Sequence, residues 1–85
     1  MGRLYSGNLN DFKAATDKLS KLDLVVICND WYSSRMGSNF MFIRIYDTEG
    51  NLIVTNAFSR YDEDVMYNMC TAWLNRMYDQ LKDWK

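Results

Sequence analysis

The side chains able to do chemistry are few in this sequence, and their spacing is poor for catalysis. Histidine is absent, which removes the commonest general base and with it the usual serine and cysteine triads. Two cysteines, Cys28 and Cys70, lie in apolar segments without a neighbouring base, so we expect buried free thiols rather than nucleophiles. The 4 glycines are too dispersed for a phosphate-binding loop. The sequence therefore predicts a protein that is not an enzyme and needs no cofactor.

One acidic group, Asp62, Glu63 and Asp64, could in principle collect a divalent cation. Consecutive residues of a helix point about 100° apart, so these carboxylates would not converge on one ion without other ligands. Ser59 and Asp62 have the spacing of a helix capping box, and acids in a first turn complement the helix dipole. We expect helix capping at this position and no metal site.

Length and charge predict a single folded domain, residues 1–85. The chain is 48% hydrophobic and 15% aromatic, which is too apolar for a disordered segment. Its formal net charge is −1, with acidic and basic residues alternating along most of the chain. Nucleic-acid binders usually carry a basic excess, because phosphate neutralisation dominates their affinity. Nucleic acid is therefore disfavoured as the main partner.

The sequence also predicts a cytoplasmic protein without a membrane partner. No run approaches the roughly 18 apolar residues that a membrane span needs, and the N-terminal segment lacks the apolar stretch of a secretory signal. Free thiols are consistent with a reducing compartment.

Polarity patterns and turn residues predict an α+β fold in the order helix–strand–strand–strand–helix. We expect helices at about 10–21 and 60–83, with strands at about 23–29, 39–46 and 51–58. The apolar run 24–28 is typical of a strand covered on both faces. The turn at 47–51 holds Gly50 where a positive φ is required. The product is a three-stranded antiparallel sheet with a short N-terminal and a long C-terminal helix.

Alternation within the expected elements assigns side chains to faces. Along the second strand, one face receives the apolar residues Met41, Ile43 and Ile45. The other face receives Phe40, Phe42, Arg44 and Tyr46. The last helix gathers one broad apolar face: Met66, Met69, Cys70, Trp73, Leu74, Met77, Leu81 and Trp84. That helix is expected to lie across the sheet.

The strands offer apolar residues to both faces of the sheet, and two arrangements follow. If both helices cover one face, the other is exposed and apolar, which usually marks an interface. If the helices are divided between the faces, the apolar surplus becomes ordinary core. The sequence leaves both arrangements open.

The segment 29–39 is expected to be a loop that carries binding residues. Trp31, Tyr32, Arg35 and Met36 belong to residue types that suit protein interfaces, and loops often position such residues. The alternative for Trp31 is that it folds back onto the edge of the core. The aromatic face of the second strand, Phe40, Phe42 and Tyr46 with Arg44, has three readings: core packing, which the sequence favours, a protein interface, or a platform that stacks unpaired bases.

The order of elements from residue 10 to 84 resembles two groups of proteins. One is the double-stranded-RNA-binding domain, whose last helix begins with a lysine-rich signature; here Arg60 is followed by Asp62, Glu63 and Asp64, which removes the phosphate-gripping residues. The other is the class of very small phage-encoded inhibitors of host machinery, anti-CRISPR proteins among them. The chain is similar to several of these in size, topology, acidic pI and content of Asn, Tyr, Met and Asp.

The resemblance implies a non-enzymatic phage protein that occludes a host protein, such as a nucleic-acid-processing enzyme or a CRISPR nuclease. The resemblance carries over no functional residues, so the contacts are expected from residue type: Trp31, Tyr32, Arg35 and Met36 as anchors. The acidic group Asp62, Glu63 and Asp64, extended by Asp47 and Glu49, is expected to mimic phosphate charge toward a nucleic-acid enzyme. A nucleic-acid-binding sheet and a homodimer that pairs exposed sheet faces are the alternatives.

Overall fold

The computed structural model describes residues 6–83 and confirms the α+β fold. Helix α1 spans Ser6–Ser20 and helix α2 spans Glu63–Leu81; between them lie β1 (Val25–Ser33), β2 (Ser38–Tyr46) and β3 (Leu52–Arg60). The three strands form one antiparallel sheet in the order β1-β2-β3, so that β2 is central and the other two are edge strands. Each strand follows its neighbour through a hairpin, which is the shortest antiparallel connection.

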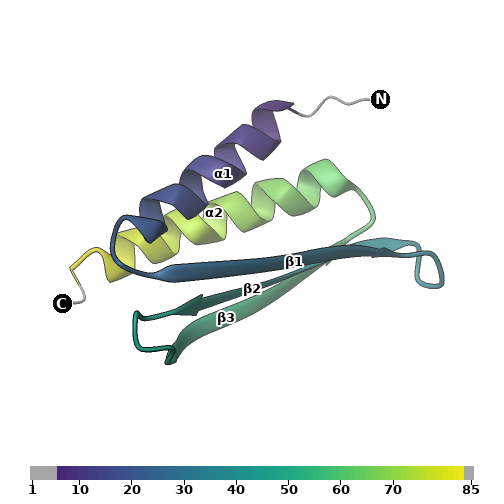
Figure 1. Ribbon diagram of the computed structural model, residues 1–85. Coiled ribbons are helices and arrows are strands. Elements are labelled where there is room, and N and C mark those ends of the chain that lie inside the picture. The colour runs from purple at the N-terminus through teal and green to yellow at the C-terminus, as the bar shows by residue number, and fades with distance from the viewer. Residues whose placement is uncertain (1–5, 84–85) are drawn as a thin grey trace.

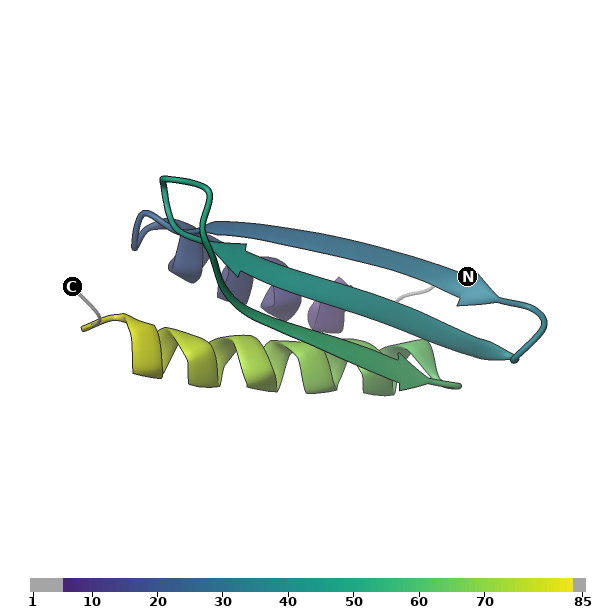
Figure 2. The ribbon, with the colours of Figure 1, turned by 90° about the horizontal axis from the view of Figure 1, so that it is seen from below.

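Both helices lie on the same face of this sheet, which decides between the two arrangements that the sequence left open. Figure 1 shows α1 and α2 side by side above the strands, and Figure 2, from below, shows the strands in front of both helices. The molecule therefore has two layers, one of helices and one of strands. The second sheet face has no covering element among residues 6–83.

The core lies between these layers and confirms the alternation predicted for β2. Met41, Ile43 and Ile45 point to the helices and are at most 1% exposed. They meet the apolar faces of the two helices, whose buried residues are Phe12, Ala15 and Leu19 from α1 and Met66, Cys70, Trp73 and Leu74 from α2. An edge-to-face contact between Phe12 and Tyr67, with ring centroids 5.2 Å apart, joins the helices. Trp84, expected on the same apolar face of α2, lies outside the described residues.

The expected loop 29–39 is wrong, because β1 continues as a strand to Ser33. It pairs with β2 along its whole length, with Trp31 opposite Phe40 and Tyr32 opposite Asn39. The polar residues Asn29 and Asp30 led the sequence analysis to end the strand too early. They are compatible with β1 because it is an edge strand, where side chains need no apolar surroundings. Only residues 34–37 remain as the turn, where Gly37 has φ +64° and its N–H donates to the Ser33 carbonyl at 2.7 Å.

The capping box expected at Ser59 is also wrong, since Ser59 is part of β3. Asp62 is the N-cap of α2, in an extended conformation, and its Oδ1 accepts a hydrogen bond from the Asp64 N–H at 2.9 Å. Glu63 and Asp64 occupy the first turn, where carboxylates complement the helix dipole. The expectation that this acidic group caps the helix is confirmed. The helix itself begins at Glu63, a few residues after the start that the sequence predicted.

Strand β3 has side-chain partners for two of its own backbone groups. Asn56 Oδ1 accepts from the N–H of Ala57 at 2.8 Å, and Arg60 Nη1 donates to the carbonyl of Ser59 at 2.6 Å. Edge strands otherwise expose rows of unpaired backbone groups. These two contacts occupy part of that row near the C-terminal end of β3.

Candidate protein-binding surface

The uncovered side of the sheet is the largest feature that the core does not use, and we call it the open face. Strand register defines its members, because residues directly opposite one another share a face. The open face consists of Val25, Ile27, Asn29, Trp31 and Ser33 from β1, Ser38, Phe40, Phe42, Arg44 and Tyr46 from β2, and Leu52, Thr55, Ala57 and Ser59 from β3. Apolar and aromatic side chains dominate this set.

An aromatic cluster occupies the half of the open face nearest the β1–β2 turn. We define it as Trp31, Phe40, Phe42 and Arg44. The Trp31 and Phe40 rings stack with centroids 5.2 Å apart and planes 8° apart, and Trp31 meets Phe42 edge to face at 5.1 Å. The Arg44 guanidinium carbon lies 5.8 Å from the Phe42 ring centroid, within the usual range for a cation–π contact. These contacts hold the four side chains in place.

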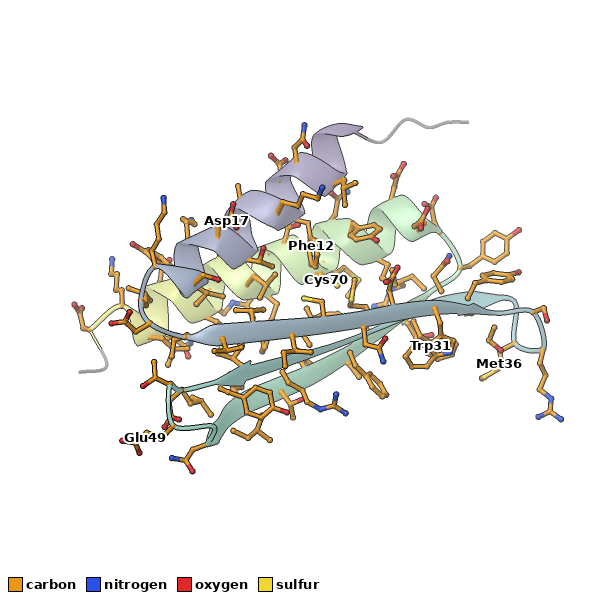
Figure 3. The ribbon with its side chains drawn as sticks, viewed as in Figure 1. Phe12, Asp17, Trp31, Met36, Glu49 and Cys70 are labelled. Atoms are coloured by element: carbon orange, nitrogen blue, oxygen red, sulfur yellow. The ribbon has the colours of Figure 1, made fainter. Side chains whose placement is uncertain are left out.

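Trp31 remains 41% exposed although it packs against two rings. It neither extends from a mobile loop nor folds back onto the helix-side core, so both expectations for this residue are replaced. Figure 3 shows Trp31 on the side of the sheet that faces away from the helices. A large, ordered and accessible indole loses little conformational entropy on binding, which favours a role as an anchor.

The other half of the open face carries the aliphatic residues Val25, Ile27 and Leu52 beside Tyr46, and the sequence did not single these residues out as contacts. Val25 is 47% exposed and Ile27 46%, and Leu52 is also exposed. The unbroken run 24–28 predicted a strand covered on both faces, and this prediction is wrong for Val25 and Ile27. The run does supply apolar residues to both faces, but both helices pack on the same one (Figure 1).

The open face carries no carboxylate. All 11 acidic residues of the chain lie elsewhere. For example, Asp30 projects from β1 to the helix side, where its Oδ2 accepts from the Tyr67 hydroxyl at 3.4 Å. Arg44 is the one charged residue among the strand positions of the open face. The uncovered side of an overall acidic protein is therefore apolar with a single cation.

The structure brings together only some of the predicted anchor residues. Trp31 and Met36 lie on the same side of the sheet (Figure 3), and Met36 is 67% exposed in the β1–β2 turn. Tyr32 alternates to the opposite side of β1 and is also exposed. Arg35 belongs to the turn itself and is exposed. Of the four anchors, Trp31 thus belongs to the aromatic cluster, Met36 lies on the same side of the sheet, and Tyr32 lies on the other side.

The structure does not bring the five predicted acidic residues together. Asp47 and Glu49 belong to the β2–β3 turn, whereas Asp62, Glu63 and Asp64 follow β3. These positions are at opposite ends of β2, about 27 Å apart at a rise of ~3.4 Å per residue. Figure 3 places Glu49 at the end of the molecule away from Trp31 and Met36. A single phosphate-mimicking patch from all five residues is therefore wrong.

Asp47 is already occupied by its own turn. Its Oδ1 accepts from the N–H groups of Glu49 and Asn51, each at 2.9 Å, and its Oδ2 accepts from Asn51 Nδ2 at 3.1 Å. The Asn51 backbone N–H is the main cause that lowers the pKa of the Asp47 carboxyl. Gly50 in the same turn has φ +87°, as the sequence predicted. Asp47 thus stabilises its own hairpin.

The two thiols are unsuited to nucleophilic chemistry, as expected. Cys70 is fully buried and Cys28 partly buried, both on the helix side of the sheet. Burial, and then the charge of Asp30, raise the pKa of Cys28 to about 11; burial, and then Cys28, raise that of Cys70 to about 12. A thiolate is the reactive form of cysteine, so both residues are inert at neutral pH.

Outside the open face, residues 6–83 offer little for binding a small ligand or a metal ion. Within residues 6–83, no three acidic or sulfur-bearing side chains group together in a way that could hold a metal ion. A shallow depression of about 290 Å³ lies between β3 and α2, lined by Asn56, Phe58, Met69, Ala72, Trp73 and Arg76. It is widely open and belongs to the helix side of the molecule.

No helix among the described residues has the length and apolar character to cross a membrane.

Fold and surface together define a small two-layer α+β protein with one open, aromatic and acid-free sheet face. The chain belongs to the family described as "Bacteriophage T7-like, gene 1.2", which matches residues 1–85. It is 62% identical over 85 residues to the "Inhibitor of dGTPase" of Escherichia phage T7, and the alignment covers 100% of both chains. It is 33% identical over 90 residues to the "Gene 1.2 protein" of Enterobacteria phage T3, covering 100% of this chain and 98% of that protein.

These similarities confirm the resemblance to small phage-encoded inhibitors and correct its finer part. The family is the gene 1.2 family of T7-like phages and not an anti-CRISPR family. The T7 protein is named for inhibiting an enzyme rather than for a catalytic activity. This supports the prediction that the chain is not itself an enzyme.

Proposed function

We propose that this protein is an inhibitor of a dGTPase in the infected bacterium and that it acts by binding the enzyme directly. The observation that carries the proposal is the 62% identity to the "Inhibitor of dGTPase", which extends over the whole of both chains. The proposed target differs from the one that the resemblance implied. It is a nucleotide-hydrolysing enzyme rather than a CRISPR nuclease. Enzyme and inhibitor would meet in the host cytoplasm.

The chemistry of the described residues supports inhibition by occlusion rather than by reaction. The chain lacks histidine, and its two thiols have raised pKa values. Neither modification of the enzyme nor hydrolysis of its substrate has a suitable group here. What the chain does offer is an ordered, exposed apolar surface, which is the usual means of binding another protein.

Titration of a purified Escherichia dGTPase with this protein tests the proposal. We expect dGTP hydrolysis to fall in proportion to added protein until the inhibitor and enzyme subunits reach a fixed ratio. The protein incubated with dGTP alone should release no product. A variant that cannot keep its core, Ile43→Asp, serves as the matched control and should leave the enzyme active. Full enzyme activity at a large excess of the folded protein would reject the proposal.

The predicted anchors Trp31, Tyr32, Arg35 and Met36 remain the proposed contact residues at this stage. Their side chains do not all lie on the same side of the sheet, so variants can test the two sides separately. Trp31 and Met36 lie on the side of the open face (Figure 3), whereas Tyr32 alternates to the other side of β1.

A further inference from the structure

We propose that the open face, centred on the aromatic cluster, is the surface that docks on the dGTPase. We further propose that the matching patch on the enzyme is apolar and contributes a carboxylate opposite Arg44. This inference rests on the proposed function, because it names the surface through which that function is exerted. It replaces the acidic residues that the sequence suggested as the contact.

The first argument is the contrast between the open face and the outer surface of the helices. The solvent side of α1 mixes charges of both signs, including Lys13, Asp17 and Lys18, and the C-terminal half of α2 exposes Arg76 and Asp79. Exposed charges are strongly hydrated and contribute little to affinity. The open face instead presents aromatic and aliphatic side chains in one continuous sheet surface. Apolar surface of this kind is typical of the buried centre of an interface.

The second argument is preorganisation. Trp31 is stacked on Phe40 and braced by Phe42, with centroid distances of 5.2 and 5.1 Å. All three residues lie in paired β-strands, so neither their backbones nor their rings need ordering on contact. Binding therefore avoids the entropic cost that a loop of the same composition would incur.

The third argument is charge complementarity. Arg44 is partly buried, lies over the Phe42 ring at 5.8 Å, and shares the open face with no carboxylate. A planar guanidinium held in this way can form a bidentate pair with a carboxylate of a partner. The same face would repel a basic patch. An acidic group on an apolar dGTPase surface is thus the chemistry that fits.

Two variants, each of which replaces an alanine by glutamate, test the location of the docking surface without removing any packed side chain. Ala57 lies opposite Phe42 on the open face, whereas Ala14 lies on α1; both are exposed. Ala57→Glu adds a carboxylate to the proposed interface, and Ala14→Glu adds the same charge to the helix surface. We expect Ala57→Glu to weaken inhibition of dGTP hydrolysis by about 30-fold or more, the range of a hot-spot change. Ala14→Glu should change it by less than about threefold.

A second pair of variants tests the anchor itself. Trp31→Ala removes the centre of the cluster; Tyr61→Ala removes an aromatic ring that is 81% exposed between β3 and α2, outside the open face. We expect about 30-fold weaker inhibition for the first and less than about threefold for the second. Circular dichroism and thermal unfolding establish that each variant is folded. If Trp31→Ala is not folded, the result for Ala57→Glu decides.

The outcomes separate this inference from the proposed function. If the unaltered protein does not inhibit the enzyme, the proposed function fails. If it inhibits and the folded open-face variants inhibit equally well, the function stands and the location is wrong.

Light scattering and oligonucleotide binding identify other occupants. A dimer that Ala57→Glu converts to monomer with unchanged inhibition would assign the face to a second copy. Oligonucleotide binding lost in that variant with unchanged inhibition would assign it to nucleic acid. Either result overturns the proposal.

Discussion

The two faces of one sheet are used differently in this protein. On the helix side, Met41, Ile43 and Ile45 are at most 1% exposed and form the centre of the core. On the other side, Ile27 and Trp31 are 46% and 41% exposed, although they are as apolar as the residues beneath the helices. Apolar content alone does not separate a core from a contact surface. What separates them here is the packing of both helices on the same face of the sheet (Figure 1).

Charge divides the molecule along the same boundary. Carboxylates lie on the helices, in the turns and on the helix side of β1, where several have structural partners: Asp62 caps α2, Asp30 accepts from Tyr67, and Asp47 holds its hairpin. The open face has none. Four predictions test whether the two sides really have separate roles, one in stability and the other in contact.

The largest expected effect is on the helix side. Ile43→Ala should lower the free energy of unfolding by about 2–5 kcal/mol, because a fully buried aliphatic side chain is lost and a cavity remains. Urea unfolding followed by circular dichroism measures the change. A loss below about 1 kcal/mol would mean that the helix side is less tightly packed than its burial indicates.

The next effect concerns the acidic end of α2. Asp62→Ala removes the N-cap that accepts from the Asp64 N–H and should cost about 1 kcal/mol in the free energy of unfolding. Glu63→Ala, one residue later, serves as the control and should cost less. Inhibition of dGTP hydrolysis should be unchanged in both variants while they remain folded. Strong loss of inhibition in a folded Asp62→Ala variant would return the acidic group to the list of contacts.

A smaller stability effect is expected on the open face. Ile27 is half exposed, so Ile27→Ala should cost about 1 kcal/mol or less. Its effect on inhibition should exceed its effect on stability if the aliphatic half of the open face joins the contact. Comparing the midpoint of urea unfolding with the inhibition constant for the same variant separates the two. A stability loss as large as that of Ile43→Ala would contradict the division between the faces.

The smallest effect at neutral pH is on thiol chemistry. Burial, and then the charge of Asp30, raise the pKa of Cys28 from the usual value of 9.0 to about 11. Alkylation of the native protein should therefore be slow at pH 7 and quicken about tenfold per pH unit up to roughly pH 10. The raised pKa keeps the thiol of the folded state protonated where that of the unfolded state ionises. Its contribution to the stability of the fold is therefore fully present below the unfolded pKa of 9.0 and declines as pH rises towards about 11. Cys28→Ser provides the control for labelling, and rapid alkylation at pH 7 would show that Cys28 is accessible and ionised.

The sequence predicted the order of elements and the division of the β2 side chains between two faces, because both depend on local patterns, but it did not predict which of these faces the helices cover. Met41, Ile43 and Ile45 could be assigned to one face by period alone, and Gly50 by the geometry of its turn. The extent of β1 could not be found in the same way. Its second half is polar at Asn29, Asp30 and Ser33, and it is held in the sheet by pairing with β2 across the hairpin, which is not encoded in β1 alone.

The candidate surface was predicted in part for a similar reason. Residue type singled out Trp31, but its stacking on Phe40 depends on strand register. Val25 and Ile27 could be assigned neither to the core nor to an exposed face, because a sequence does not state on which side of a sheet its helices pack. The acidic residues were grouped by charge, although a nine-residue strand separates the β2–β3 turn from the start of α2.

The side-chain partners along β3 bear on how the protein behaves when many copies are made at once. Asn56 and Arg60 occupy the Ala57 N–H and the Ser59 carbonyl at the rim of the sheet. A strand from another molecule would have to displace them before it could extend the sheet. Growth of a fibre through this rim is thereby hindered at these two positions. The protein can then leave the open face uncovered with less risk that copies polymerise strand by strand.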